Sequence, residues 1–347
     1  MKLFILGYPS DLGGANTECW HTIKLWRRAG CDVTAIPTWQ ELPGWRQRLE
    51  AIGVSTHAGL TPENWRPGVY PRDLPGAVVV AFCNTKFLAE AHRFRALGCR
   101  IVWVGCMNFI FPGERLHYQR HGVFDRYVFQ SRYQQDELAP QLRRFGYQDD
   151  RGRMLRGAFC CDEFPFRPLG HTPGTPLVVG RLSRAAPDKY SRDTWRTYGR
   201  ILHPARARIM GWNAEVEAVV GRPPDWAEVL PPCAMSAADF LATLHAAAMA
   251  GGGAIENWPR IGLEAMATGV PLVAERQGGW PEMIRHGATG YLADTPDEMA
   301  YHVSRLAYDE PHRQAIIHQA RHVLERELAE PETIWRGWKS LFEELNA

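Results

Sequence analysis

The sequence lacks several patterns that would place it in common classes of protein. It has no run of 18 apolar residues, so we expect no helix that spans a membrane. Its eight cysteines form no C-x-x-C pair and no Cys/His cluster with zinc spacing. There is no G-x-G-x-x-G motif, which excludes the usual nucleotide loop of dehydrogenases. Because the cysteines lie in or beside apolar segments, we expect reduced, buried thiols of a cytoplasmic protein.

Length and charge indicate two domains of unequal charge. The 347 residues are 45% apolar and 22% charged, which suits two globular domains that each have a core. The net charge of +2 divides unevenly, because residues 1–155 carry +6 and the remainder carries −4. A basic first half indicates an acidic ligand, although an ordinary Arg-rich surface explains it equally well.

Strand and helix patterns alternate along the whole chain. Strands are predicted at 2–8, 32–37, 77–82, 100–105, near Phe124, and at 176–183, 207–212 and 270–274. Helices are predicted near 16–30, 85–97, 132–145, 191–202, 236–249, 296–307, 311–328 and 332–346. This alternation predicts an α/β fold with parallel sheets that helices cover on both faces. The Pro- and Gly-rich stretch 164–176 predicts a linker between domains at 1–165 and 173–330.

The most informative stretch is residues 251–290. Glu256 and Glu264 stand eight positions apart, and an apolar strand follows a helix rich in small residues. The exposed N–H groups at the start of such a helix suit a phosphate. A carboxylate nearby can accept hydrogen bonds from sugar hydroxyls. The pattern therefore predicts a cradle for a nucleotide-sugar.

This pattern resembles the E-x7-E signature of retaining GT-B glycosyltransferases, family 4 in particular. The resemblance implies two Rossmann-like domains whose parallel sheets face a central cleft. The first domain would bind the acceptor and the second, 173–330, the nucleotide-sugar donor. The C-terminal helix, about 331–347, would cross back to the first domain.

The resemblance also implies roles for the residues of the motif. Glu256 would bind hydroxyls of the transferred sugar, and Glu264 the ribose of the nucleotide. Backbone N–H groups near Arg260, Ile261 and Gly262 would meet the diphosphate. Pro259 stands where the family usually has glycine, so one possible N–H donor is missing.

A second constellation is the basic stretch 179–190. By resemblance, Arg181 and Lys189 occupy the places of two basic residues that contact the diphosphate, and Arg184 is a competing candidate. Fixed cations stabilise the charge that develops on a departing diphosphate. We therefore predict Arg181, Lys189 and Glu256 as the catalytic set. Surface charge around a turn is the alternative interpretation.

A third constellation lies in the first loop, where Gly13 and Gly14 precede a helix. It resembles the first loop of these enzymes and predicts donor contacts, although a simple tight turn explains the two glycines as well. Many family members carry a histidine after the fourth strand, and here Cys106 and Asn108 stand in that region. The predicted acceptor-side residues are Asp11, Asn16, Glu18, Asn108 and His117.

The resemblance implies a retaining hexosyltransferase that moves a sugar from a nucleotide-diphosphate sugar to an acceptor hydroxyl. A UDP-sugar is the favoured donor. The departing phosphate oxygen would take the acceptor's proton, so no protein base is essential. The D-x-D triplet that holds a metal in GT-A enzymes is absent, and we predict no required metal and no other cofactor.

The acceptor stays open between several classes. The basic first half and a mixture of Trp and Arg favour an acidic acceptor, such as a hydroxymethylated base of phage-type DNA, with aromatics to hold an extruded base. Amphipathic packing explains the same mixture, which comprises Trp20, Trp26, Arg27, Arg28, Trp45, Arg46 and Arg48. The alternatives are assembly of a bacterial glycolipid or polysaccharide with peripheral membrane contact, a GT-B-fold sugar-nucleotide 2-epimerase, and a non-catalytic donor-binding protein.

Overall fold

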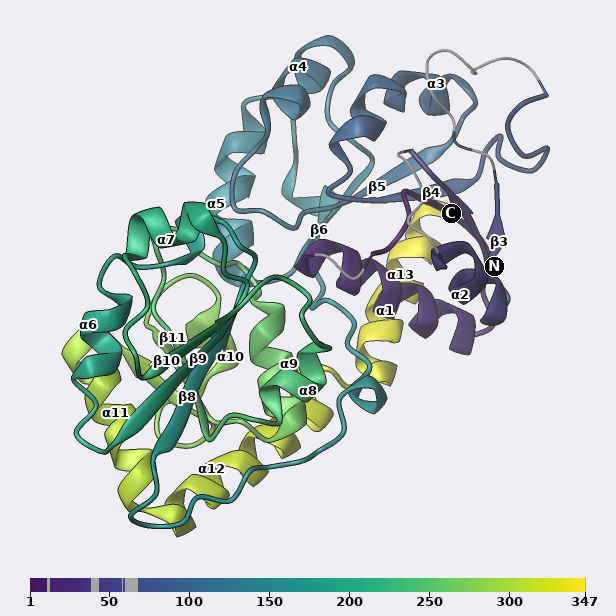
Figure 1. The fold of residues 1–347 in the computed structure, drawn as a ribbon. Helices are drawn as coiled ribbons and strands as arrows, with labels where there is room; N and C mark the ends of the chain where they lie inside the picture. The colour runs from purple at the N-terminus through teal and green to yellow at the C-terminus, as the bar shows by residue number, and fades with distance from the viewer. Residues whose placement is uncertain (11–12, 39–43, 58, 60–67, 347) are drawn as a thin grey trace. The chain divides into compact units, whose positions relative to one another are not determined.

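The chain forms two compact units, each with its own sheet and its own core. The structure is a computed structural model, and it describes residues 1–10, 13–38, 44–57, 59 and 68–346. The first unit comprises Met1–Phe159 and Pro331–Ala347, and the second comprises Cys160–Glu330 (Figure 1). The division falls a few residues before the predicted linker at 164–176.

Within its described residues, the first unit contains a seven-stranded parallel sheet in the order β3-β2-β1-β4-β5-β6-β7. The strands are β1 Lys2–Leu6, β2 Asp32–Ile36, β3 Ser55–Thr56, β4 Val78–Phe82, β5 Arg100–Val104, β6 Arg126–Phe129 and β7 Gly152–Met154. The helices are α1 Gly14–Arg28, α2 Trp45–Ala51, η1 Thr85–Ala89, α3 Ala91–Ala96, α4 Pro112–His121, α5 Arg132–Arg143, η2 Asp149–Arg151 and α13 Pro331–Asn346. The continuous apolar run of β4 fits a central strand that is buried on both faces.

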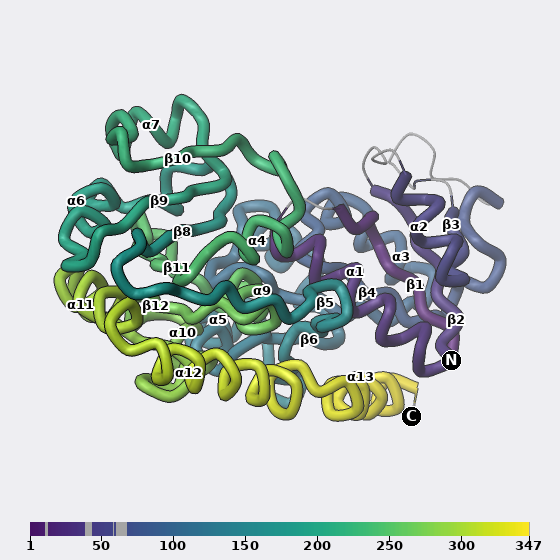
Figure 2. The backbone as a smooth tube through the Cα atoms, turned by 60° about the horizontal axis from the view of Figure 1, so that its bottom comes forward, coloured from purple at the N-terminus to yellow at the C-terminus, as the bar shows by residue number. Residues whose placement is uncertain are grey.

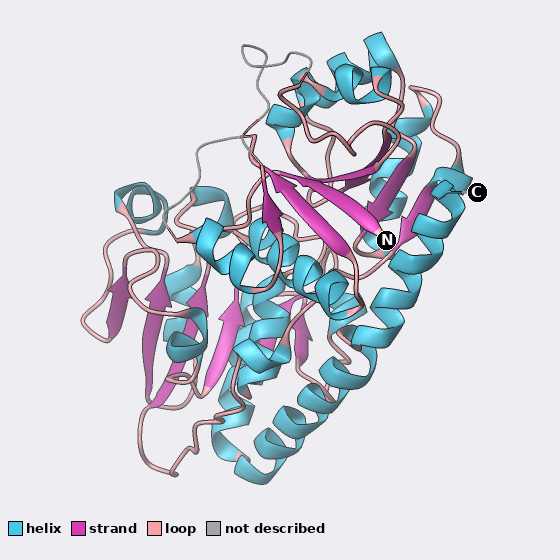
Figure 3. Cartoon of the chain, turned by 90° about the vertical axis from the view of Figure 1, so that its right-hand side faces the viewer, coloured by secondary structure: helices cyan, strands magenta, loops and turns pink. Residues whose placement is uncertain are grey.

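The second unit repeats this plan with a parallel sheet in the order β10-β9-β8-β11-β12-β13. Figure 3 shows the strands of each sheet pointing in one direction with helices packed on them. The strands are β8 Leu177–Leu182, β9 Ala205–Met210, β10 Ala227–Leu230, β11 Ala246–Met249, β12 Leu272–Glu275 and β13 Tyr291–Ala293. The helical segments are η3 Cys161–Glu163, η4 Pro187–Lys189, α6 Thr194–Gly199, α7 Ala214–Val220, α8 Ala237–Leu241, α9 Arg260–Thr268, α10 Trp280–Met283, α11 Pro296–Tyr308, α12 Glu310–Val323 and the π-helical η5 Leu324–Leu328.

The predicted helix at 236–249 is wrong. Helix α8 starts after Ser236, whose hydroxyl accepts the N–H of Asp239 at 3.0 Å, but it ends at Leu241. The backbone N–H of His245 donates to the carbonyl of Val178 at 2.9 Å, and the buried strand β11 follows at once. A short run of buried alanines has no periodicity that separates a helix from a strand.

Both ends of the chain contribute to one core in the first unit. Trp26 of α1 meets the rings of Trp338 and Phe342 in α13, with ring centroids 5.0 and 5.4 Å apart. Figure 2 shows α13 next to α1. Edge-to-face aromatic pairs of this kind contribute about 0.5–1.5 kcal/mol each beyond the area that they bury. The first unit is therefore completed by the last helix of the chain.

Candidate functional site

Two loops of the second unit are locked together at the carboxyl edge of its sheet. One follows β8 and the other follows β11, and these two strands are neighbours. The N–H of Ala254 donates to the carbonyl of Asp188 at 3.0 Å. A Cβ atom at Gly252 would lie only 2.3 Å from the carbonyl oxygen of Tyr190, so this close approach requires glycine. The carboxyl edge of a parallel sheet is where α/β folds bind their ligands.

Lys189 and Glu256, one from each loop, form an ion pair. The Lys189 Nζ lies 2.6 Å from Glu256 Oε1, and the two side chains are 14% and 36% exposed. Because the pair is only partly covered, a ligand can reach both groups. The structure thus brings together two residues that the sequence placed 67 positions apart. Arg184, the competing cation, is exposed, and its side chain makes no hydrogen bond or ion pair with a described residue.

Arg181, at the end of β8, is buried beneath these loops with only 2% of its surface exposed. Its guanidinium donates to the carbonyl of Ala250, to the hydroxyl of Ser183 at 3.0 Å and to the carbonyl of Lys189 at 2.5 Å. It also lies 4.3 Å from the centre of the Tyr190 ring. Arg181 therefore holds both loops in place and presents no open face to a ligand.

Helix α9 begins where the second loop ends. Pro259 stands at the N-cap and has no N–H, while the N–H of Gly262 donates to the carbonyl of Pro259 at 3.0 Å. Three backbone N–H groups were predicted to donate to the diphosphate. That of Gly262 already donates to Pro259 at the start of the helix. A Cβ atom at Gly262 would lie 2.2 Å from Met283 Sδ and 2.9 Å from the Trp280 ring, so glycine here serves the packing of α10.

Glu264 lies in the second turn of α9 and is 9% exposed. Its carboxylate makes no hydrogen bond with a described residue. Burial raises the pKa of Glu264 to about 6, although the nearby Arg260 cation opposes the shift. The two predicted glutamates therefore differ, because Glu256 is paired with a cation whereas Glu264 is a desolvated acceptor without a hydrogen-bond donor.

A third loop, after β12, supports the loop that carries Glu256, and it contains none of the predicted site residues. The N–H of Gly279 donates to the Glu256 carbonyl at 2.7 Å. A Cβ atom at Gly278 would lie 2.2 Å from that carbonyl oxygen, and one at Gly279 would lie 1.8 Å from the carbonyl oxygen of Asn257. Adjacent glycines directly after a buried strand were the available signal for this contact.

The predicted residues of the first loop lie in the first unit. Gly13 has a φ of +85°, and α1 begins at Gly14. Asn16 donates to Ser10 Oγ at 2.7 Å. Glu18 is buried and accepts a hydrogen bond from the side chain of Gln130. Asp11 lies outside the described residues.

The remaining two acceptor-side candidates differ in their exposure. Asn108 is partly exposed, and its amide lies 3.5 Å from the hydroxyl of Tyr133. His117 is 4% exposed and stacks on Phe124 with ring centroids 4.9 Å apart. Burial lowers the pKa of His117 to about 4. This side chain belongs to the core beneath α4, which corrects its interpretation as a group facing an acceptor.

The three tryptophans of the predicted mixture of Trp and Arg are packed within the first unit. Trp20, Trp26 and Trp45 are all buried. Arg48 lies 3.7 Å from the centre of the Trp45 ring, and Arg27 donates to the carbonyl of Ile52 at 3.1 Å. None of these three indole rings is available to stack on a base.

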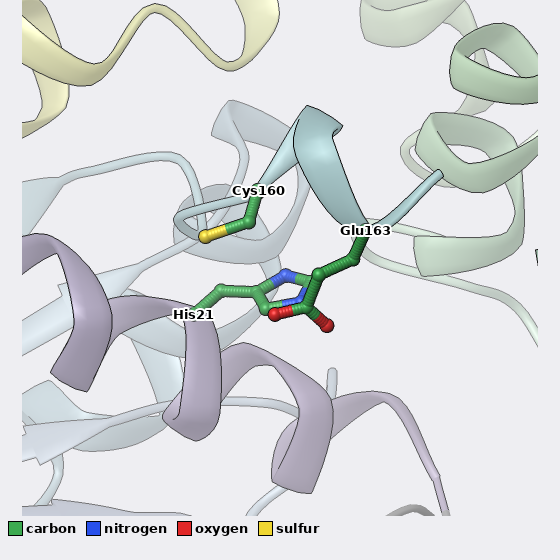
Figure 4. Close-up of side chains that lie close together, drawn as sticks. All are labelled: His21, Cys160 and Glu163. Atoms are coloured by element: carbon green, nitrogen blue, oxygen red, sulfur yellow. The ribbon is translucent and has the colours of Figure 1, made fainter. Parts of the chain in front are cut away.

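The remaining predictions concern the state of the cysteines and the absence of a membrane-spanning helix. Figure 4 shows His21 of α1, whose ring lies 5.3 Å from that of Phe159. It also shows Cys160, which precedes η3 at the start of the second unit, and Glu163, the last residue of η3. All eight cysteines are free, and Cys233 is exposed, against the expectation that the thiols are buried. No helix in the described part of the chain is long and apolar enough to cross a membrane.

Part of the second unit matches a known family in sequence. Residues 235–323, which include both glutamates and α9, match the family model of glycosyl transferases group 1. The N-acetyl-alpha-D-glucosaminyl L-malate synthase of Bacillus anthracis is 52% identical over 42 residues. Those residues are 12% of this chain and 11% of that protein, so the chain spans only a small part of this curated relative.

Solved structures match along the whole chain. HepE of Anabaena, in complex with UDP and glucose, has a TM-score of 0.74 at 16% identity, covering 99% of this chain and 100% of that one. TarM of S. aureus, in complex with fondaparinux, alpha-GlcNAc-glycerol and UDP, has a TM-score of 0.75 at 10% identity, covering 98% and 99%. Sucrose-phosphate synthase of Thermosynechococcus elongatus has a TM-score of 0.70 at 13% identity, covering 99% of both. The predicted GT-B fold is confirmed.

Proposed function

Because its second unit carries a domain of glycosyl transferases group 1 and the chain has the GT-B fold, we propose that this protein moves a sugar from a nucleoside-diphosphate sugar to an acceptor hydroxyl. The observation that carries the proposal is the partly exposed ion pair at 2.6 Å between Lys189, in the loop after β8, and Glu256, in the loop that leads into α9. A UDP-sugar is the proposed donor, and the UDP bound to HepE and TarM supports this choice.

The proposed chemistry assigns a separate task to each group of the site. As the bond between sugar and diphosphate breaks, negative charge develops on the diphosphate. Lys189 is placed to stabilise this charge, and it acts mainly in the transition state. Glu256 binds sugar hydroxyls beside it, and Glu264 accepts hydrogen bonds from the ribose. Arg181 is a positioning residue that fixes the backbone of Lys189.

Retention of configuration and independence from metal belong to the same proposal. The departing phosphate oxygen takes the proton of the acceptor hydroxyl while the new glycosidic bond forms on the same face of the sugar. Neither step needs a protein nucleophile or a metal ion. Added chelator would therefore leave the rate unchanged, and NMR of the product would show the anomeric configuration of the donor.

The acceptor has to be identified by comparing several chemical classes of acceptor in one experiment. The charge of +6 on residues 1–155 still favours an acidic acceptor, but the buried tryptophans remove the argument that aromatics hold an extruded DNA base. Hydroxymethylcytosine DNA, glycolipids and polysaccharide primers therefore enter the experiment on equal terms.

The experiment is a matrix of UDP- and GDP-sugars against these acceptors, with mass detection of products. We expect one donor and one acceptor class to give a product heavier by a single sugar residue. Glu256→Ala should abolish that product, whereas Arg184→Ala should retain it. Conversion of the sugar nucleotide without any acceptor would indicate an epimerase instead. Donor binding without release of nucleotide, for every acceptor, would indicate a binding protein.

A further inference from the structure

Two cysteines meet at the carboxyl edge of the first unit's sheet. Cys83 directly follows β4, and Cys106 lies two residues beyond β5, its neighbour in the sheet. Both approach one carbonyl oxygen, that of Val104. The N–H of Cys83 donates to it at 3.0 Å, and the Cys106 Sγ lies 3.7 Å from it. Both residues also line one small cavity, together with Trp103, Gly105 and other side chains.

The register of the sheet brings these cysteines close together, and their thiols interact. Phe82 pairs with Val104 at the ends of β4 and β5, so Cys83 and Cys106, just beyond these ends, are offset by one residue. Continuing both strands with an ideal spacing of about 4.8 Å and a rise of about 3.3 Å per residue would give a Cα–Cα separation of about 6 Å. Disulfides form at Cα–Cα separations of about 4.4–6.8 Å, most often near this value. The backbones therefore need little movement to be bridged.

The local chemistry distinguishes the two thiols. Cys83 is half-buried and has a φ of +45°, a conformation that a non-glycine residue rarely holds without a reason. The pKa of the Cys106 thiol is held well above its ordinary value, first by the interaction with the thiol of Cys83, then by burial and by the negative charge of Glu18. Cys106 thus stays a protonated thiol until the neighbouring Cys83 has been oxidised.

We propose that Cys83 and Cys106 are a redox pair that closes to a disulfide on exposure to a peroxide. The thiolate of Cys83 attacks hydrogen peroxide, its O–O bond breaks, and Cys83 becomes a sulfenic acid. Cys106 then loses its proton and attacks the sulfur of Cys83, so that the S–S bond forms as the S–O bond breaks. Two thiols and one peroxide yield one disulfide and two molecules of water. A dithiol reductant reverses the change.

Closure would bind the segment that begins at Cys83 to the segment that begins at Cys106. On the Cys83 side, Asn84 is anchored by hydrogen bonds to the Leu6 carbonyl at 3.1 Å and to Thr38 Oγ1 at 2.6 Å. On the other side, Cys106 leads into the segment that carries Asn108 and the exposed Phe109. Resting on the proposed function, the inference is that oxidation shifts this acceptor-side segment and slows transfer. A displacement of about 1 Å near reacting groups costs up to about 100-fold in rate.

The test separates the chemistry of the thiols from the activity. The full-length protein is treated with hydrogen peroxide, alkylated, digested and analysed by mass spectrometry, before and after dithiothreitol. We expect a crosslinked peptide pair containing Cys83 and Cys106, lost in Cys83→Ser and in Cys106→Ser. Sugar transfer should fall at least about tenfold on oxidation and recover on reduction. Cys83→Gly, which suits a positive φ, covers the case in which Cys83→Ser does not fold.

Cys233 provides the matched control, because it is exposed and is the other non-glycine residue with positive φ in the described chain. Cys233→Ser should retain both the crosslink and the response to peroxide. The inference would be overturned if Cys83 and Cys106 remained separately alkylated while Cys233 was oxidised, or if Cys83 were crosslinked to Cys19. The crosslink is detected whether or not transfer is observed, so failure of the proposed function would leave this result readable.

Discussion

Replacing Lys189 with alanine should separate catalysis from stability. The lost cation faces the position proposed for the leaving diphosphate, and removal of one preorganised group of this kind costs about 2.7–4 kcal/mol of transition-state stabilisation. The expected fall in kcat is therefore about 100- to 1,000-fold. The ion pair with Glu256 is partly exposed, and such pairs contribute only about 0–1 kcal/mol to folding. The variant should unfold at nearly the wild-type urea concentration.

The assay is a single-turnover measurement of nucleotide release at saturating donor, paired with urea unfolding followed by circular dichroism. Lys339→Ala is the matched control, because Lys339 also pairs with a glutamate, at 3.8 Å, but lies exposed on α13. It should leave both readouts unchanged. A Lys189→Ala enzyme with the wild-type kcat would refute the reasoning. So would a loss of activity that simply followed a loss of folded protein.

Substitutions at Arg181, Gly262 and Glu264 test the residues that surround and support the site. Arg181→Ala should lower the free energy of unfolding by about 3–5 kcal/mol, since it leaves buried carbonyls unpaired, and Arg181→Lys should not restore it in the same urea titration. Gly262→Ala should cost about 1–3 kcal/mol by overpacking against Met283, whereas Gly170→Ala, with nothing within 4 Å, should be near neutral by thermal melting. The raised pKa of Glu264 makes the folded state bind an extra proton between about pH 4.5 and 6, so wild-type stability should fall as pH rises through that window. Glu264→Gln should flatten the pH profile and add about 2 kcal/mol above pH 6, while raising the KM for the donor. The part of the profile that comes from Glu114, whose pKa burial raises to about 7, should remain, and identical profiles for the two proteins would contradict the reasoning.

The parts of the site that follow from local sequence were predictable. The loop before α9, the helix itself and the basic residues after β8 are each encoded in short, continuous segments. The match of residues 235–323 to the family model of glycosyl transferases group 1 agrees with the predicted class for this part of the chain. The ion pair of Lys189 with Glu256 was not predicted; it arises because β8 and β11 are neighbours and both end at the same edge.

The parts that depend on distant contacts were not predictable in this way. His117 is buried because its ring stacks on Phe124. The sequence around a single histidine does not show whether its side chain faces the core or the solvent. Gly278 and Gly279 support the loop that carries Glu256 through contacts between separate segments of the chain. The hydrophobic pattern within each segment does not show such contacts. Short edge strands such as β3 and β10 are only partly buried, so they lack the apolar runs that identified β4.

The aromatic contacts between α1 and α13 have a consequence for biosynthesis. Trp26 is translated before the segment Cys160–Glu330, whereas Trp338 and Phe342 are translated after it. Until then, the first unit lacks the side chains of α13 that pack on Trp26, while the segment Cys160–Glu330 already has every strand of its sheet. The second unit can therefore complete its core before the first unit does, although its synthesis begins later.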